Sequence, residues 1–283
     1  DLKIYINNLS EINYRFFPAP HLAIEKADLN LKKNDRLIAE LNNLQVYVSL
    51  SKLYSNKEIE IRKIKIENSN FYLDKNSILS FKDHFQKKIN KSIQIINSNF
   101  FYKDKNEQVN AISPIKNLNY FIDFNSRVKK LKIKGSLFDV PYNFIWSKNY
   151  NKPNFSNLTI NFKNPNFRVE NESEKIPEDD YKKGFTKIKY LNETIYFQYT
   201  YNNEMIKFKT AKKNIKKVEL DGTIRLNPFY FEIDTVLKKQ KIDFIINKIM
   251  FYLDEYKTSI HPNFNGHLNI KFEDINNNFV KSG

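Results

Sequence analysis

The sequence predicts a mainly β protein, a long antiparallel meander that forms a curved, trough-like sheet with about two helices. Three observations lead to this fold class. Apolar and polar residues alternate along most of the chain, as they do in half-buried strands. Short clusters rich in Asn and Asp separate the alternating runs, and turns this short join antiparallel neighbours. Helical periodicity is confined to two segments.

The alternation places side chains of opposite character on the two faces of each expected strand. In one such strand, Lys130, Lys132 and Lys134 fall on one face while Leu131 and Ile133 fall on the other. Further apolar positions with the same spacing of two are Leu44, Val46, Val48, Leu50, Ile59, Ile61, Leu158, Ile160, Phe162, Ile195, Phe197, Tyr199, Tyr201, Ile206, Phe208, Phe229, Phe231, Ile233, Leu268, Ile270 and Phe272.

Two of these expected strands contain a short internal sequence repeat. Residues 64–76 and residues 93–106 share the string I-x-I-(x)-N-S-N-F, and each copy ends in an Asp-Lys-Asn turn. Asn and Asp serve as turn residues because they tolerate left-handed backbone, and the chain has only 5 Gly. Self-similarity at this period favours stacked units over a closed globule.

The two expected helices differ in how many apolar residues follow a helical spacing. The segment 81–91 has apolar residues at fourfold spacing, and the segment 240–256 has a continuous apolar stripe formed by Ile242, Ile245, Ile246, Ile249, Leu253 and Tyr256. This second helix packs on the sheet as ordinary core or covers an open end of the trough as a lid, and the pattern leaves both open. A polar stretch at 170–183 is predicted as a joint or loop within one elongated fragment spanning 1–283.

Composition excludes several classes of function. The chain has 283 residues and no Cys, so a disulfide framework, a thiolate zinc site and a Cys nucleophile are excluded. Glycine-rich phosphate loops and the G-x-S-x-G elbow are absent from the sequence. The four histidines show no metal-ligand spacing, and the acidic cluster at 178–180 lacks the spacing of a calcium loop. We therefore expect no enzyme, no metal and no cofactor.

The net charge of +15 has two interpretations. The lysines are spread along the chain, which favours compositional drift in a protein rich in Lys, Asn, Ile, Phe and Tyr. The alternative is a basic β-rich module that binds nucleic acid or another polyanion. Its footprint would be Lys130, Lys132, Lys134, Lys209, Lys212, Lys213, Lys216 and Lys217.

Three stretches resemble the AsmA-like family of bacterial envelope proteins. Residues 12–29 contain a Pro-rich turn followed by L-x-I-E-x-x-x-L, and residues 59–71 read I-x-I-x-x-I-x-I-x-N-x-x-F. Residues 222–231 match the pattern G-x-I-x-x-x-P-F-x-F. Proteins of this family are anchored in the inner membrane by an amino-terminal helix and extend into the periplasm, and they are implicated in phospholipid movement and outer-membrane biogenesis.

The resemblance implies that the trough-like sheet is a β-groove of the family's repeating type. It also implies a periplasmic lipid conduit, tethered to the inner membrane through an anchor helix that these residues do not include. Its partners would be phospholipid or another acyl lipid, with nucleic acid disfavoured and other envelope proteins possible as partners. The expected groove lining is a set of apolar strand residues: Leu131, Ile133, Leu158, Ile160, Phe162, Ile195, Phe197, Phe229, Phe231, Leu268 and Ile270. The expected lid comprises Ile242, Ile245, Ile246, Ile249 and Leu253.

Overall fold

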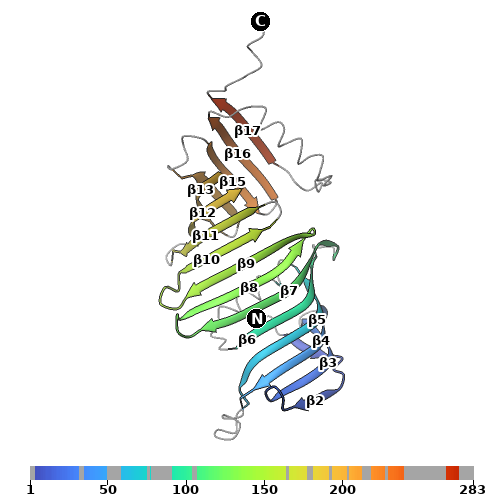
Figure 1. Ribbon diagram of the computed structural model, residues 1–283. Helices are drawn as coiled ribbons and strands as arrows, with labels where there is room; N and C mark the ends of the chain where they lie inside the picture. The colour runs from blue at the N-terminus through green and yellow to red at the C-terminus, as the bar shows by residue number, and fades with distance from the viewer. Residues whose placement is uncertain are drawn as a thin grey trace. The chain divides into compact units, whose positions relative to one another are not determined.

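The mainly β prediction is confirmed by the computed structural model, in which the described strands form one mostly antiparallel sheet of 17 strands (Figure 1). The structure describes residues 4–31, 35–49, 59–74, 77, 91–103, 107–163, 166–176, 181–190, 193–202, 204–211, 218–226, 229–238 and 266–273. The chain divides into two compact units. Unit 1 comprises Asp1–Pro153 and Leu158–Arg168, and unit 2 comprises Asn154–Asn157 and Val169–Gly283.

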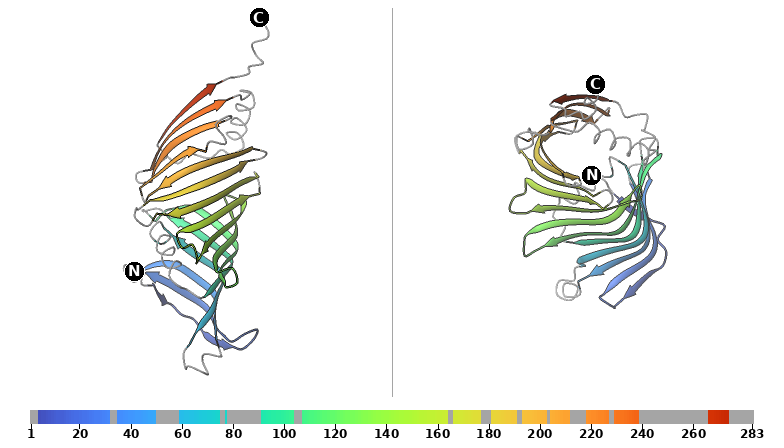
Figure 2. Two further views of the ribbon diagram at one scale, coloured as in Figure 1. Left: turned by 90° about the vertical axis from the view of Figure 1, so that its left-hand side faces the viewer. Right: turned by 45° about the horizontal axis from the view of Figure 1, so that its top comes forward.

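Unit 1 contains the longest strands and also the two shortest, which have four residues each. Its strands are β1 (Ile4–Asn7), β2 (Ile12–Arg15), β3 (His21–Leu31), β4 (Arg36–Val48), β5 (Ile61–Leu73), β6 (Ser92–Lys103), β7 (Val109–Asp123), β8 (Val128–Leu137), β9 (Val140–Asn149) and most of β10 (Phe155–Phe162). From β2 to β10 each strand lies beside the next in the chain, and β1 pairs with β3. Figure 2 shows these strands bent along their length.

Unit 2 continues with shorter strands. They are β11 (Phe167–Lys175), β12 (Lys182–Tyr190), β13 (Glu193–Tyr201), β14 (Met205–Thr210), β15 (Val218–Leu226), β16 (Phe229–Lys238) and β17 (Gly266–Glu273). Strands β12 to β16 are antiparallel neighbours in chain order. The stretch at 170–183, predicted as a joint, includes parts of β11 and β12 and residues 177–180, which lie outside the described residues.

Two neighbouring pairs are parallel, which differs from a meander built only of hairpins. These pairs are β5 with β6 and β16 with β17. Parallel neighbours need a crossover of a dozen or more residues, and both connections have that length. Each predicted helix falls in one of these connections. The segment 81–91, apart from Lys91, and the segment 240–256 lie outside the described residues.

The two copies of the internal sequence repeat form neighbouring strands, β5 and β6, that pair in register. Ile64 lies opposite Ile93, Asn70 opposite Asn99, and Phe71 opposite Phe100. Identical or similar residues therefore lie opposite each other along β5 and β6. The rings of Phe71 and Phe100 meet edge to face with their centroids 5.1 Å apart.

Both copies of the repeat contain a residue with positive φ at the same position. Asn68 and Asn97 adopt left-handed backbone, with φ of 53° and 47°. A residue in this conformation adds a bulge and resets which face the next residues occupy. As a result Ile66 before the bulge and Phe71 after it lie in the same buried cluster, although an odd spacing separates them.

Two buried serines satisfy the backbone groups beside these bulges. The Ser69 hydroxyl accepts a hydrogen bond from the Asn42 amide at 2.8 Å and donates to the Glu67 carbonyl at 2.9 Å. The Ser69 amide donates to the Ser98 hydroxyl at 3.1 Å. Because unpaired buried amides are costly, these short polar side chains make the bulge line compatible with burial.

The apolar core of unit 1 lies on one face of the sheet along this line. Its buried members are Ile24, Ala27, Ala39, Leu41, Leu44, Ile66, Phe71, Ile95, Ile115 and Leu118. Leu131 and Ile133 of β8 pack against this cluster while remaining half-buried. The core therefore passes into a more exposed apolar surface toward β8.

The left-handed Asn68 generates a stability prediction. Asn68→Ile should lower the free energy of unfolding by about 2 kcal/mol because a β-branched residue is strained at positive φ. Asn68→Gly should leave it nearly unchanged because Gly adopts this backbone freely. Urea unfolding measures both, with Arg62→Ile at an ordinary position of the same strand as the control. Equal stability of the Ile and Gly variants would contradict the bulge.

Candidate functional site

The strand register divides unit 2 into an apolar face and a polar face. Directly opposite residues share a face, so a row can be followed across neighbouring strands. One such row consists of Tyr201, Ile206, Ile224 and Phe231. All four are half-buried and apolar or aromatic. Because their neighbours along each strand point the other way, this row lies on what we call the apolar face of unit 2.

A second row on the apolar face combines two glycines with two aromatic rings. Gly184, Tyr199, Phe208 and Gly222 are successive cross-strand partners. A Cβ on Gly184 would lie 2.3 Å from the Tyr199 ring, and a Cβ on Gly222 would lie 2.7 Å from the Phe208 ring. Each ring therefore covers the neighbouring glycine, and the space of the missing side chain is filled from the adjacent strand.

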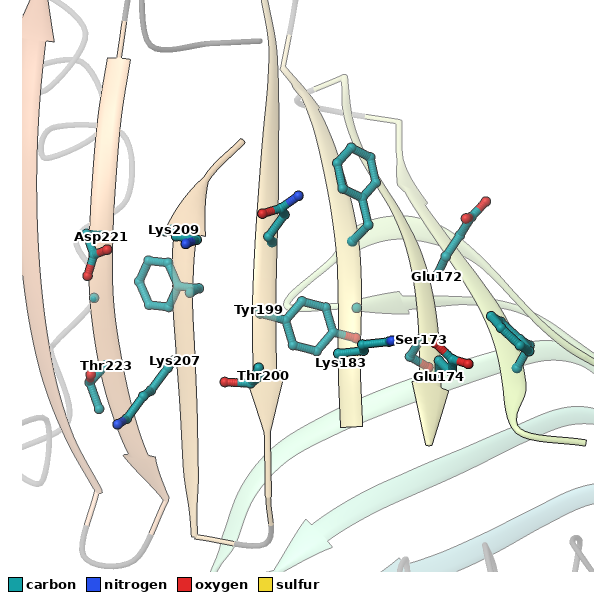
Figure 3. A pocket seen from close by; sticks show the side chains of 16 residues that line it. Glu172, Ser173, Glu174, Lys183, Tyr199, Thr200, Lys207, Lys209, Asp221 and Thr223 are labelled. Carbon is teal, nitrogen blue, oxygen red and sulfur yellow. Dashed lines mark ion pairs between the residues drawn. The ribbon is translucent and has the colours of Figure 1, made fainter. Parts of the chain in front are cut away.

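Unit 2 contains a depression of about 720 Å³ (Figure 3). Most of its lining side chains come from two cross-strand rows of the polar face. They are Lys183, Thr200, Lys207 and Thr223 in one row, and Phe185, Gln198, Lys209 and Asp221 in the other. The row of Gly184, Tyr199, Phe208 and Gly222 runs between them and also lines the depression.

Charges in this depression balance. It is lined by three lysines (Lys183, Lys207 and Lys209) and three carboxylates (Glu172, Glu174 and Asp221). Lys183 pairs with Glu174 at 3.1 Å, and the two lie side by side in Figure 3. Polyanion binding depends on a surplus of positive charge, so a balanced depression does not favour it.

A second ion pair lies on the same polar face. Lys187 contacts Glu170 at 3.1 Å. The hydrogen bond with Glu170 raises the pKa of Lys187 above its ordinary value, so this lysine stays charged throughout the physiological range. Phe185 stacks on Tyr196 beside it, with ring centroids 5.6 Å apart.

The predicted polyanion footprint is dispersed over the described residues. Lys130 pairs with Asp123 at 3.1 Å, and the Lys132 ammonium lies 5.5 Å from the centroid of the Phe121 ring. Lys134 also lies in β8, whereas Lys209 belongs to unit 2. The remaining predicted positions, Lys212, Lys213, Lys216 and Lys217, lie outside the described residues.

The apolar face of unit 1 carries an unbroken row of apolar residues across eight strands. From β2 to β9 the cross-strand partners are Tyr14, Leu22, Val46, Ile64, Ile93, Tyr120, Leu131 and Trp146. Tyr120 is buried and the others are half-buried or exposed. Burial, followed by the nearby Tyr150, raises the pKa of Tyr120 to about 12, so its phenol is neutral at physiological pH.

The groove residues predicted in unit 1 lie along this apolar face. Leu131 belongs to the unbroken row, and Ile133 lies opposite Leu118 and Phe144. In β10, Phe162 meets the Tyr142 ring with centroids 6.1 Å apart, which places it on the face of Tyr142. Leu158 and Ile160 share that face by alternation.

The groove residues predicted in unit 2 occupy three strands. Ile195 and Phe197 in β13 share the face of Tyr199, and Phe231 belongs to the row described above. Leu268 and Ile270 lie opposite Ile233 and Thr235 and are exposed. Phe229 begins β16.

The predicted lid residues Ile242, Ile245, Ile246, Ile249 and Leu253 lie outside the described residues. Sequence reasoning left Trp146 and Phe144 out of the predicted lining. The alternation of Tyr142, Phe144 and Trp146 along β9 was the signal that indicated them.

Within the described part of the chain, no group of three His, Asp or Glu side chains is placed to hold a metal ion. Among the same residues, no helix has both the length and the apolar character needed to cross a bilayer.

Comparison with known proteins assigns no family. No family model matches the chain. The DNA-directed RNA polymerase subunit beta'' of Bigelowiella natans is 23% identical over 261 residues, which is 89% of this chain. The chain spans only 15% of the length of that protein.

The two covered glycines generate a second prediction. Gly222→Ala should destabilise the protein by about 1–3 kcal/mol because the new methyl group meets the Glu232 carbonyl at 2.7 Å as well as the Phe208 ring. Gly184→Ala should cost less because the nearest atoms are those at the far end of the Tyr199 side chain, which can rotate away, and no backbone atom is among them. Thermal unfolding of the two variants measures the difference. A larger loss for Gly184→Ala would contradict this packing.

Proposed function

We propose that this protein is a non-enzymatic module that binds lipid acyl chains along its apolar sheet faces. The observation that supports this proposal is the unbroken apolar row from Tyr14 to Trp146 in unit 1. Soluble sheets commonly bury such a face, yet here most of the row is half-buried or exposed. The resemblance to the AsmA-like family points to the same ligand class.

The dimensions of the apolar faces suit an acyl chain. Neighbouring strands are about 4.8 Å apart, so the row across β2 to β9 extends over roughly 34 Å. One leaflet of a bilayer has a hydrocarbon thickness of about 15 Å. An extended acyl chain laid across the strands would therefore touch three or four apolar side chains of one row.

The energetics favour a surface of this kind. Each methylene exposed to water costs about 0.8 kcal/mol, so a sixteen-carbon chain costs on the order of 12 kcal/mol to expose. Half-buried residues such as Leu131, Trp146 and Phe162 would shield such a chain, while its polar head group stays in water. Binding of this kind needs no catalytic residue.

Trp146 supplies a direct test because it is the only Trp in the chain and lies on the apolar row. A fatty acid brominated along its chain should quench Trp146 fluorescence, and the unbrominated fatty acid should compete with it. Bromine quenches only at close range, so the signal reports chains on this face. Quenching that a water-soluble bromide reproduces at the same concentration would contradict the proposal.

A matched pair of variants locates the binding surface. Leu131→Asn adds a polar group beside Trp146 and should weaken fatty-acid binding by about tenfold, equivalent to roughly 1.4 kcal/mol. Lys132→Asn changes the next residue on the polar face and should leave the affinity nearly unchanged. Thermal unfolding confirms that both variants fold. Equal affinities for the two folded variants would place the ligand elsewhere.

A further inference from the structure

The edge of unit 1 carries a cluster of exposed aromatic and aliphatic side chains. It consists of Ile12 and Tyr14 of β2 and Phe16 and Phe17 of the turn that follows, exposed by 56%, 45%, 63% and 88%. We call these four residues the aromatic edge. Phe17 has the greatest exposure among the exposed large hydrophobic residues described.

The aromatic edge differs from the isolated apolar residues found on most protein surfaces. Phe124 and Phe138 are also exposed, by 72% and 73%, but each lies alone in a hairpin turn of another part of unit 1. At the aromatic edge the Tyr14 and Phe16 rings meet edge to face with centroids 4.8 Å apart. Exposed apolar clusters of this kind mark contact surfaces, whereas single residues do not.

Two further observations indicate what covers this surface. Arg15 lies between Tyr14 and Phe16 with its side chain exposed, and the exposed Glu11 precedes Ile12. Phe16 and Phe17 lie in the turn between β2 and β3, and their side chains are largely exposed. Exposed rings flanked by a cation match the bilayer interface, where aromatic residues partition near the head groups and basic residues meet anionic lipids.

The aromatic edge is also continuous with the apolar face of unit 1. Tyr14 is the first member of the unbroken row, and Ile12 lies opposite the core residue Ile24. The apolar row thus ends at the solvent-exposed rings of Tyr14, Phe16 and Phe17. A flat or recessed apolar patch would suit a protein partner equally well, but an exposed turn of this composition favours a soft surface that needs no matching pocket.

We propose that the aromatic edge inserts into the interface of a lipid bilayer and docks unit 1 on a membrane surface. This inference goes beyond acyl-chain binding, since it names a bilayer as a partner and a different set of residues as the contact. Phe16 and Phe17 enter the boundary between head groups and acyl chains. Arg15 remains at the level of the phosphates.

Vesicle binding tests this proposal. The protein is sedimented with vesicles of phosphatidylcholine and phosphatidylglycerol in equal amounts. The double variant Phe16→Ser/Phe17→Ser should lower the partition coefficient by about a hundredfold, since removing each ring costs about tenfold. The matched double variant Phe124→Ser/Phe138→Ser removes two equally exposed rings and should leave partitioning within about twofold of the parent.

A second measurement reports insertion itself. Phe17→Trp in a chain whose Trp146 is replaced by Phe should shift its emission to the blue on addition of vesicles, and Phe138→Trp in the same background should not. Both positions are exposed, so both variants are expected to fold, and thermal unfolding verifies this. Equal shifts at the two positions would overturn the proposal.

The outcomes remain separate from those of the proposed function. Quenching of Trp146 by monomeric brominated fatty acid should be unaffected by Phe16→Ser/Phe17→Ser, because these rings are not needed to bind a chain already in solution. Loss of vesicle binding with intact quenching supports docking by the aromatic edge. Failure of the parent to bind vesicles overturns the docking and assigns the edge to a protein contact, whatever the quenching shows.

Discussion

The structure of unit 1 depends on the line of bulges at which Asn68 and Asn97 adopt left-handed backbone. In a regular strand the apolar residues on the two sides of this line would fall on opposite faces, and the core cluster could not form. The extra residue at each bulge brings Ile66 and Phe71 onto one face. Ser69 and Ser98 then satisfy the amides and carbonyls that the irregular pairing leaves unmatched. Side-chain oxygens thus complete the backbone ladder of this sheet.

The mainly β class was predictable from the sequence because spacing of two is a local property. The side-by-side placement of β5 and β6 was indicated by the string that they share. The bulges were not predictable, since an Asn in a left-handed bulge is indistinguishable in sequence from an Asn in a turn. The parallel pairing of β5 with β6 also escaped prediction, because it depends on a crossover and not on the strands themselves.

The candidate surfaces were predictable only in part for a similar reason. Alternation assigned Leu131 and Ile133 to one face of their own strand. It could not join the faces of different strands into rows, because a row requires the register of every intervening pair. Trp146 therefore acquires its place next to Leu131 only from the structure. The same holds for Gly184 and Gly222, whose cover by Tyr199 and Phe208 is a cross-strand relation.

The in-register pairing of two copies has a consequence for how the length of this protein can change. Ile64 and Ile93 are partners, so the repeat unit is the 29 residues that separate them. Duplicating that whole unit would widen the sheet by one strand. The new strand would again pair like residue with like residue and would carry its own serine at the position of Ser69 and Ser98. Inserting an odd number of residues within a strand would instead move the apolar side chains beyond the insertion to the opposite, solvent-facing side of the sheet. The sheet can therefore grow in whole modules and resists growth by single residues.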